Sequence, residues 1–218
     1  MKRLKNIVNP VYDKYLEIPF ADYQQKIRFY ERHHKELKYL PKDIFNDLFV
    51  EYTKSLYQVR EIGQFLKIVD RTIELIIIEN IENYSGDNLY EELLYMKASA
   101  LYYQLKHKQA EYVLKELIKI QGASKKTRSL FLKNAVEALR YNDQFIRSMI
   151  ILLIILSGIT IGLELLLVRS FYPEHTGWIE KLRITFLLSG ILLFIFQEFR
   201  VRFVSAIRYK RILNKSKG

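Results

Sequence analysis

The stretch that decides the fold is SMIILLIILSGITIGLELLLV, which runs from Ser148 to Val168. It holds 21 residues, about the number that an α-helix needs to cross the hydrocarbon core of a bilayer, and its single charge is Glu164, near one end. Core helices of soluble proteins rarely run so long without a polar face. A cleaved signal peptide is excluded, because the stretch lies about two-thirds of the way along the chain. The sequence therefore predicts a membrane span at about residues 148–168.

A second apolar run, ITFLLSGILLFIF, covers Ile184 to Phe196. Thirteen residues are short for a span, but apolar residues continue on both sides of the run. Arg200 and Arg202, which interrupt it, can extend their charged ends to the headgroups while their stems stay in lipid. We therefore predict a second span at about residues 182–202. The alternative is a re-entrant or interfacial helix.

The two runs are joined by Arg169–Lys181, in which Pro173 and Gly177 break helices and Tyr172 and Trp178 suit a membrane interface. So short a connection predicts a helical hairpin with both flanks on one side. Cytoplasmic flanks carry an excess of cations, so we predict an integral protein of a bacterial inner membrane with both termini cytoplasmic. The last twenty residues hold seven cations and no acid: Arg200, Arg202, Arg208, Lys210, Arg211, Lys215 and Lys217.

Small residues recur inside the hairpin. Ser157, Gly158 and Gly162 lie in the first run, and Ser189 and Gly190 lie in the second. Small side chains let helix backbones approach closely, which favours association in lipid. We predict that these five residues mark membrane-helix packing, either within the hairpin or between the chains of a homo-oligomer.

Composition narrows the functional classes. The chain has 218 residues and no cysteine, which excludes disulfides, thiol catalysis and cysteine-ligated metals. The net charge of +11 at pH 7 would suit a nucleic-acid-binding protein. Much of the excess lies beside the apolar region, however, as expected of membrane flanks. We therefore expect membrane lipid as a partner and do not expect nucleic acid.

The residues before the apolar region predict a soluble helical layer, because apolar positions recur at helical spacing. The predicted fold class is all-α: a cytoplasmic helical-repeat or helical-bundle domain at residues 1–143, a transmembrane hairpin at 144–204 and a basic cytoplasmic tail at 205–218. Caps and breakers place the helices at about 22–39, 41–60, 64–84, 89–106, 109–121 and 124–140.

The helical pair at residues 89–121 resembles one tetratricopeptide unit. Ala98 and Ala110 stand at the two small positions where the paired helices cross, and Leu94, Leu101 and Leu114 stand at bulky ones. The pair departs from the family in three ways: Ala98 replaces a glycine, Leu117 replaces an alanine, and no proline closes the unit. An upstream pair aligns 45 residues earlier, against the family repeat of about 34.

By resemblance, such a pair implies a concave surface that binds a protein or peptide. Tyr95, Tyr102 and Tyr103 are the candidate residues of that partner groove, because tyrosine gives helical repeats an adaptable binding surface. An unrelated helical bundle, in which these tyrosines are packing residues, remains the alternative.

The candidate chemistry is confined to Arg28 and His33. Their RxxxxH spacing is similar to that of the HEPN ribonucleases, a helical family in which the arginine and histidine act on RNA phosphates, usually across a dimer. The match lies nearer the amino terminus than is common in that family. No zinc-protease, phosphate-loop or serine-hydrolase motif occurs, and we expect no catalytic residue, cofactor or metal.

The sequence therefore predicts a membrane-anchored helical adaptor or scaffold that holds a partner protein at the cytoplasmic face, without catalysis. The alternative is an oligomeric membrane effector whose hairpins form a pore, for example a defence-system accessory protein with a degenerate HEPN-like motif.

Overall fold

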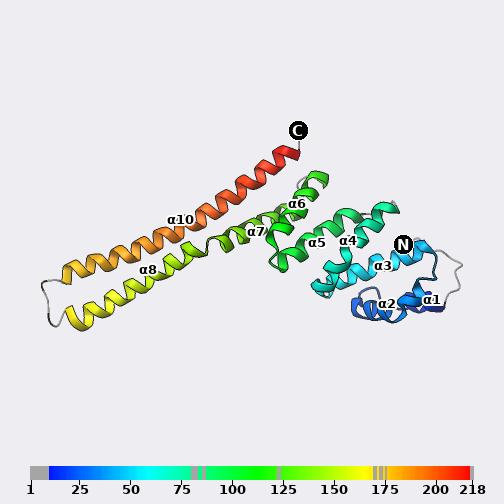
Figure 1. Ribbon diagram of the computed structural model, residues 1–218, viewed down its shortest axis with the longest axis horizontal. Helices are drawn as coiled ribbons and strands as arrows, with labels where there is room; N and C mark the ends of the chain where they lie inside the picture. The colour runs from blue at the N-terminus through cyan, green and yellow to red at the C-terminus, as the bar shows by residue number, and fades with distance from the viewer. Residues whose placement is uncertain are drawn as a thin grey trace. The chain divides into compact units, whose positions relative to one another are not determined.

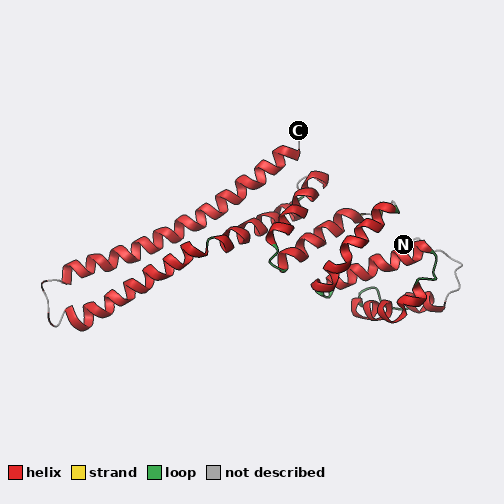
Figure 2. Ribbon diagram, in the orientation of Figure 1, coloured by secondary structure: helices red, strands yellow, loops and turns green. Residues whose placement is uncertain are grey.

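The computed structural model describes residues 10–79, 83–84, 87–121, 124–168, 171, 174 and 176–216. Over these residues the chain consists of helices joined by loops, with one pair of two-residue strands, so the predicted all-α class is confirmed. Figure 2 shows the helices in red and the loops in green. The chain divides into two compact units, Met1–Leu130 and Phe131–Gly218.

The first unit is a succession of helices in which each of the first five packs against the next (Figure 1). The third of these helices also packs against the fifth. The strands pair antiparallel between α4 and α5. The elements are α1 (Pro10–Leu16), α2 (Tyr23–Leu37), α3 (Lys42–Gln58), α4 (Ile62–Ile78), β1 (Asn83–Tyr84), β2 (Asp87–Asn88), α5 (Leu89–Tyr103), α6 (His107–Gln121) and the first residues of α7 (Lys125–Asn142).

Side-chain caps fix the starts of these helices where the sequence predicts them. The Asp22 carboxylate accepts a hydrogen bond from the Gln25 backbone N–H at 2.9 Å at the start of α2. The Asn88 side chain accepts from two backbone N–H groups of α5, and the Ser124 hydroxyl accepts from the Thr127 N–H at 3.2 Å before α7. Each cap satisfies a backbone donor that the helix itself leaves unpaired.

Two turns of the first unit have the same construction. After α3, Arg60 takes the left-handed conformation (φ 64°), and after α5, Leu105 does so (φ 58°). In the first turn the Glu61 N–H donates to the Leu56 carbonyl at 2.9 Å, and in the second the Lys106 N–H donates to Leu101 at 3.0 Å. Both are Schellman motifs, which end one helix and turn the chain into the next. Residues at equivalent positions of the two turns are 45 positions apart in the sequence.

The buried positions of the two helical pairs follow the same offset. Val69 and Leu114 are completely buried in α4 and α6. Thr53 of α3 is also completely buried, and its hydroxyl lies 2.9 Å from that of Thr72 in α4. The α3–α4 crossing thus holds a hydrogen-bonded threonine pair. Apolar residues occupy the equivalent positions of α5 and α6: Ala98 and Leu117.

The second unit consists of the remainder of α7, α8 (Gln144–Leu163), the π-helical η1 (Glu164–Val168) and α10 (Thr176–Ser216). Asp143 forms the turn between α7 and α8, where the sequence predicts a joint. Helices α8 and α10 lie side by side and run antiparallel (Figure 1).

The divisions of the chain differ from the expected ones at two places. The boundary between units falls inside α7 rather than at residue 143, because the second half of α7 packs against α10: the Phe131 and Tyr209 rings lie 5.9 Å apart. Helix α10 is continuous for 41 residues, so no break separates the expected second span from the expected tail.

One helical segment of the described chain, Gln144–Leu166, is long and apolar enough to cross a membrane. The sequence predicts two. The uncharged apolar run in α10 is shorter than the one in α8, because it is bounded by the charged residues Arg183 and Glu198.

Candidate functional site: the apolar hairpin and the aromatic pocket

One face of α8 forms its contact with α10. The residues of this face are buried or half-buried and follow one another at alternating intervals of three and four: Ile150, Leu153, Ser157, Thr160 and Glu164. This spacing keeps one stripe of a helix facing a partner. Two of its polar groups have hydrogen-bond partners: the Thr160 hydroxyl donates to the Ser157 carbonyl of the same helix at 2.8 Å, and the Glu164 carboxylate accepts from Arg183 of α10.

The other faces of the hairpin are apolar and exposed. We call them the apolar band. Large aliphatic and aromatic side chains point away from the α8–α10 contact along both helices. The exposed members include Ile151, Leu152, Ile154, Ile155, Ile159, Ile161, Leu163, Ile184, Leu187, Leu188, Ile191, Leu192, Phe194, Ile195 and Phe196. Soluble monomers rarely expose apolar patches of this extent, which mark membrane or protein interaction surfaces.

Ion pairs between helices close the apolar band at each end. At one end the Arg183 guanidinium donates to the buried Glu164 carboxylate at 2.8 Å. At the other end Arg140 donates to both carboxylate oxygens of Glu198, each at 2.9 Å, and Arg200 pairs with Asp143. We call these two groups the charged layers.

The five small residues predicted for helix packing separate into two sets. Ser157 is buried, and Gly190 is so close to α8 that a Cβ there would lie 3.6 Å from Leu153. Ser189 is half-buried. A Cβ placed on Gly158 or Gly162 would have no neighbour within 4 Å. These two glycines therefore do not line the contact between α8 and α10.

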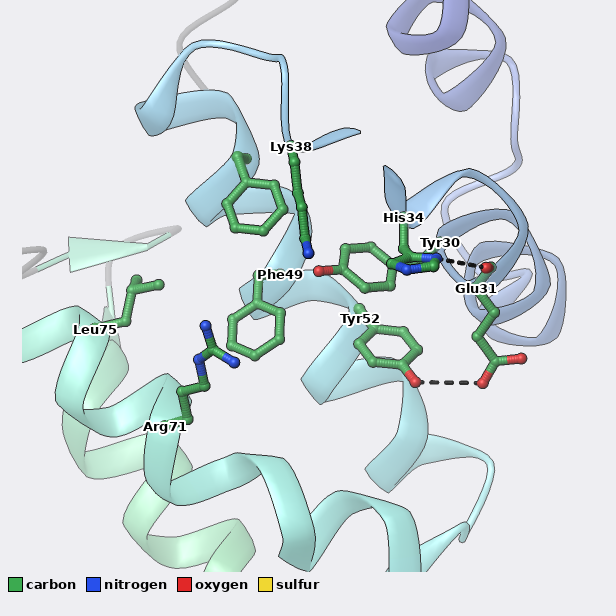
Figure 3. A pocket seen from close by; sticks show the side chains of 9 residues that line it. Tyr30, Glu31, His34, Lys38, Phe49, Tyr52, Arg71 and Leu75 are labelled. Carbon is green, nitrogen blue, oxygen red and sulfur yellow. Dashed lines mark hydrogen bonds between the residues drawn. The ribbon is translucent and has the colours of Figure 1, made fainter. Parts of the chain in front are cut away.

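A pocket of about 410 Å³ opens between α2, α3 and α4 of the first unit. We call it the aromatic pocket (Figure 3). Tyrosine and phenylalanine rings, four in all, form much of its wall, and one histidine, two cations, one carboxylate and one leucine complete it. The lining residues are Tyr30, Glu31, His34, Lys38, Phe45, Phe49, Tyr52, Arg71 and Leu75.

The rings of the aromatic pocket are packed against one another in a fixed order. Tyr30 and Tyr52 stack with their centroids 4.3 Å apart, and Phe45 and Phe49 lie nearly parallel at 6.4 Å. The Arg71 guanidinium lies 6.0 Å from the centre of the Phe49 ring, which is within range of a cation–π interaction. Residues from three helices thus give a preformed aromatic surface with a cation at its edge.

The charges in the aromatic pocket are divided between its two sides. The Glu31 carboxylate accepts a hydrogen bond from the Tyr52 hydroxyl at 3.3 Å. In Figure 3 the Tyr30 and Tyr52 rings lie between this carboxylate and the Arg71 guanidinium. Neither Arg71 nor Lys38 is in an ion pair with another described residue; Asp70, beside Arg71, bonds to Lys97 instead. The Arg71 side of the aromatic pocket is therefore positive.

Both tyrosines keep their hydroxyl protons throughout the physiological range. Burial raises the pKa of Tyr30 to about 12, against a smaller opposite effect of Arg71. Burial also raises the pKa of Tyr52 to about 12, helped by the negative charge and the hydrogen bond of Glu31. The Tyr30 hydroxyl is therefore a neutral hydrogen-bond donor, whereas the single hydroxyl proton of Tyr52 is already donated to Glu31.

The tyrosines that the sequence assigns to a partner groove lie elsewhere, on α5. Tyr102 packs against its neighbour Tyr103, with ring centroids 5.7 Å apart, and against His107 at 6.0 Å. Tyr103 is exposed and Tyr95 is half-buried. The aromatic pocket was missed from the sequence because its rings come from separate helices. Three of the rings, those of Phe45, Phe49 and Tyr52, follow one another on α3 at i, i+4 and i+7, a spacing that is also typical of the core face of a helix.

Arg28 and His33, the HEPN-like pair, both line a shallow pocket on α2. Arg28 donates to the Gln24 side chain at 3.4 Å. The His33 ring lies 3.1 Å from the Glu36 carboxylate and packs against Phe29. Each member of the pair therefore bonds to a neighbour on its own helix.

In the part of the chain that the structure describes, no group of three or more histidine, aspartate and glutamate side chains is placed to hold a metal ion. Comparison with known protein families, curated proteins and solved structures finds no match to this chain.

Proposed function

We propose that this protein is a membrane-anchored helical adaptor: the second unit crosses a bilayer twice, and the first unit binds a partner protein on the cytoplasmic side. The observation that carries the proposal is the apolar band, exposed along both helices and closed at each end by a charged layer.

The spacing of the charged layers supports the membrane assignment. From Asp143 to Glu164 the chain advances 21 residues, or about 31 Å at the helical rise. From Arg183 to Glu198 it advances 15 residues, or about 23 Å. The hydrocarbon core of a bilayer is about 30 Å thick, so the apolar band matches it closely on α8 and falls somewhat short on α10.

The ion pairs also support a second span in spite of its short apolar run. Charged groups at the edge of a bilayer are tolerated when they are paired or reach the interface. Each of three charged residues of α10 meets an opposite charge: Arg183 pairs with Glu164 of η1, Glu198 with Arg140 of α7, and Arg200 with Asp143 in the turn between α7 and α8. Pairing lowers the free-energy cost of placing the ends of the run near the headgroups.

The first unit supports an adaptor rather than an enzyme. We propose that α3–α4 and α5–α6 are two copies of a tetratricopeptide-like repeat. Their matching Schellman turns and their common pattern of burial support this, as does the packing of α3 against α5. Stacked helical pairs of this kind form extended surfaces that bind proteins and peptides.

A topology assay tests the anchor. A reporter active only in the cytoplasm is fused before Met1, after Gly218 or into the connection at residue 175, and the membrane fraction is extracted with alkaline carbonate. We expect carbonate-resistant protein, activity from both terminal fusions and none from the internal one. Equal activity from the connection and the tail would contradict the hairpin, and full extraction would contradict the anchor.

A capture assay tests the adaptor function. The full chain is purified from its native membrane in mild detergent, with a variant carrying Ile155→Arg in the apolar band as the control. We expect a second protein at fixed stoichiometry with the full chain and its loss from the membrane-deficient control. A purified chain that forms only a ring of its own copies would support the second candidate function instead.

That second candidate is an oligomeric membrane effector, and the open positions of Gly158 and Gly162 favour it. Two glycines four apart give a flat strip on one helix face, and among the described residues no atom of another part of the chain lies within 4 Å of a Cβ placed on either glycine. We expect Gly158→Leu and Gly162→Leu to reduce oligomer size if the strip joins two chains, while Ile159→Leu leaves it unchanged. Identical behaviour of all three variants would exclude the strip as an interface.

A further inference from the structure

Three features of the aromatic pocket indicate the chemistry of a ligand that would fit it. Its wall is a set of stacked rings, which is costly to leave exposed to water. Two cations, Lys38 and Arg71, lie at the same pocket without an ion-pair partner among the described residues. Its one carboxylate, Glu31, is already engaged by the Tyr52 hydroxyl. The pocket therefore suits a ligand that has an apolar part beside a negative group.

The form of the pocket favours a carboxylate over a phosphate. Protein phosphate sites commonly use backbone N–H groups at helix N-termini. Here the cationic side chains come from the C-terminal end of α2, at Lys38, and from the middle of α4, at Arg71. The C-terminal end of a helix is negative, which disfavours a doubly charged phosphate more than a singly charged carboxylate. A planar guanidinium also matches a carboxylate in geometry.

We propose that the aromatic pocket binds a peptide segment of the partner protein in which a carboxylate stands next to an aromatic or large aliphatic side chain. The carboxylate bonds to Arg71 and Lys38, and the apolar side chain packs on Phe45 and Phe49. This inference rests on the proposed adaptor function and names the chemistry that the adaptor recognises. The carboxylate is either an acidic side chain or the C-terminus of the peptide.

Two random heptapeptide libraries serve as probes against the full chain in nanodiscs. One displays free C-termini and the other displays internal segments. Enriched peptides are synthesised, and their dissociation constants are measured with wild type, Arg71→Gln and Lys38→Gln. The matched controls are Lys67→Gln, on the exposed side of α4 one turn before Arg71, and Lys35→Gln, exposed on α2. Each of the four substitutions removes one positive charge at an exposed position, so we expect folding to be unaffected.

We expect enriched peptides with an acidic group beside an apolar residue, bound at least about tenfold more weakly by Arg71→Gln, as for a lost charge-assisted hydrogen bond. The two controls should bind as wild type does. Enrichment from the free-C-terminus library alone would assign the carboxylate to the peptide end, and enrichment from both would assign it to a side chain.

The proposal would be overturned if no peptide were enriched, if the enriched peptides had no acidic group, or if the control variants lost as much peptide affinity as Arg71→Gln does. It would also be overturned if adenosine monophosphate displaced a bound peptide as strongly as a second peptide does, because that would indicate a nucleotide site. A native partner whose capture survives Arg71→Gln would overturn the peptide site but leave the adaptor function intact. Absence of any native partner would count against the adaptor function, whatever the peptides do.

Discussion

Replacing Arg183 with leucine should destabilise the hairpin, because it removes the cation that pairs with the buried Glu164 carboxylate. The Glu164 side chain is 3% exposed and that of Arg183 is 28% exposed, and the two groups meet at 2.8 Å. At that distance their attraction is about 1.5 kcal/mol in bulk water and about 6 kcal/mol at an effective dielectric constant of 20. Removing one member of a buried pair costs about 3–5 kcal/mol. Because Arg183 is partly exposed, we expect the lower end, about 3 kcal/mol.

The double variant Glu164→Leu/Arg183→Leu distinguishes the loss of the ion pair from other effects of replacing Arg183. With neither charge present, the stability of the hairpin should return to within about 1 kcal/mol of wild type. Lys181→Leu, an exposed change two residues away, is the matched control.

Trp178 is the single tryptophan of the chain and lies in α10 less than two turns before Arg183. Its fluorescence therefore reports unfolding of the hairpin in mixed micelles as denaturing detergent is added. The reasoning would be refuted if Arg183→Leu lowered the free energy of unfolding by less than about 1 kcal/mol. It would also be refuted if the double variant were as unstable as Arg183→Leu alone.

Three further predictions concern the first unit. Leu105→Gly should stabilise it by about 0.5–1 kcal/mol in urea unfolding, because Leu105 is exposed and holds a left-handed conformation that glycine adopts without strain; a loss of stability would contradict this. Burial and the charges of Asp43 and Glu51 raise the pKa of Asp47, so the folded state favours its protonated form and loses stability as pH rises through that pKa. Asp47→Asn should therefore raise the Tm at pH 7 and raise it less at pH 4, and a larger gain at pH 4 would show the sign to be wrong. Arg28→Ala and His33→Ala should each change stability and membrane level little, within about 0.5 kcal/mol; loss of function in either variant at a normal membrane level would revive the ribonuclease alternative.

Local signals in the sequence were sufficient for most of the helices and several of their starts. The helix predicted at 64–84 ends at Ile78, however, and Asn83–Tyr84 form a strand. Asp22, Asn88 and Ser124 cap helices in the structure, because the preference of such side chains for unpaired N–H groups is a local property. Helix ends were harder to predict. The sequence placed the end of α5 at about residue 106, and the helix ends at Tyr103, because the left-handed residue of the turn is Leu105 rather than a glycine.

Long-range features of the two sites could not be derived in the same way. The long apolar run of α8 was evident from composition alone, whereas the pairing of Glu164 with Arg183 depends on the register of that segment against α10. The aromatic pocket depends on rings from separate helices, each of which has the spacing of a core residue on its own helix. Only the packing of α2 and α4 against α3 decides that these rings line an open pocket.

The charged layers have a consequence for where such a hairpin can reside. Ion pairs between helices hold them at fixed heights, so the apolar length of the pair cannot adjust by sliding one helix along the other. Any mismatch with the surrounding bilayer has to be met by tilting or by local thinning, each at a fraction of a kcal/mol per Å. In the proposed two-span topology, α10, with about 23 Å between its charged layers, would fit thin bilayers better than thick ones, whereas α8, with about 31 Å, matches a bilayer of average thickness. In a cell whose membranes differ in thickness, this preference would sort the protein without a separate targeting signal.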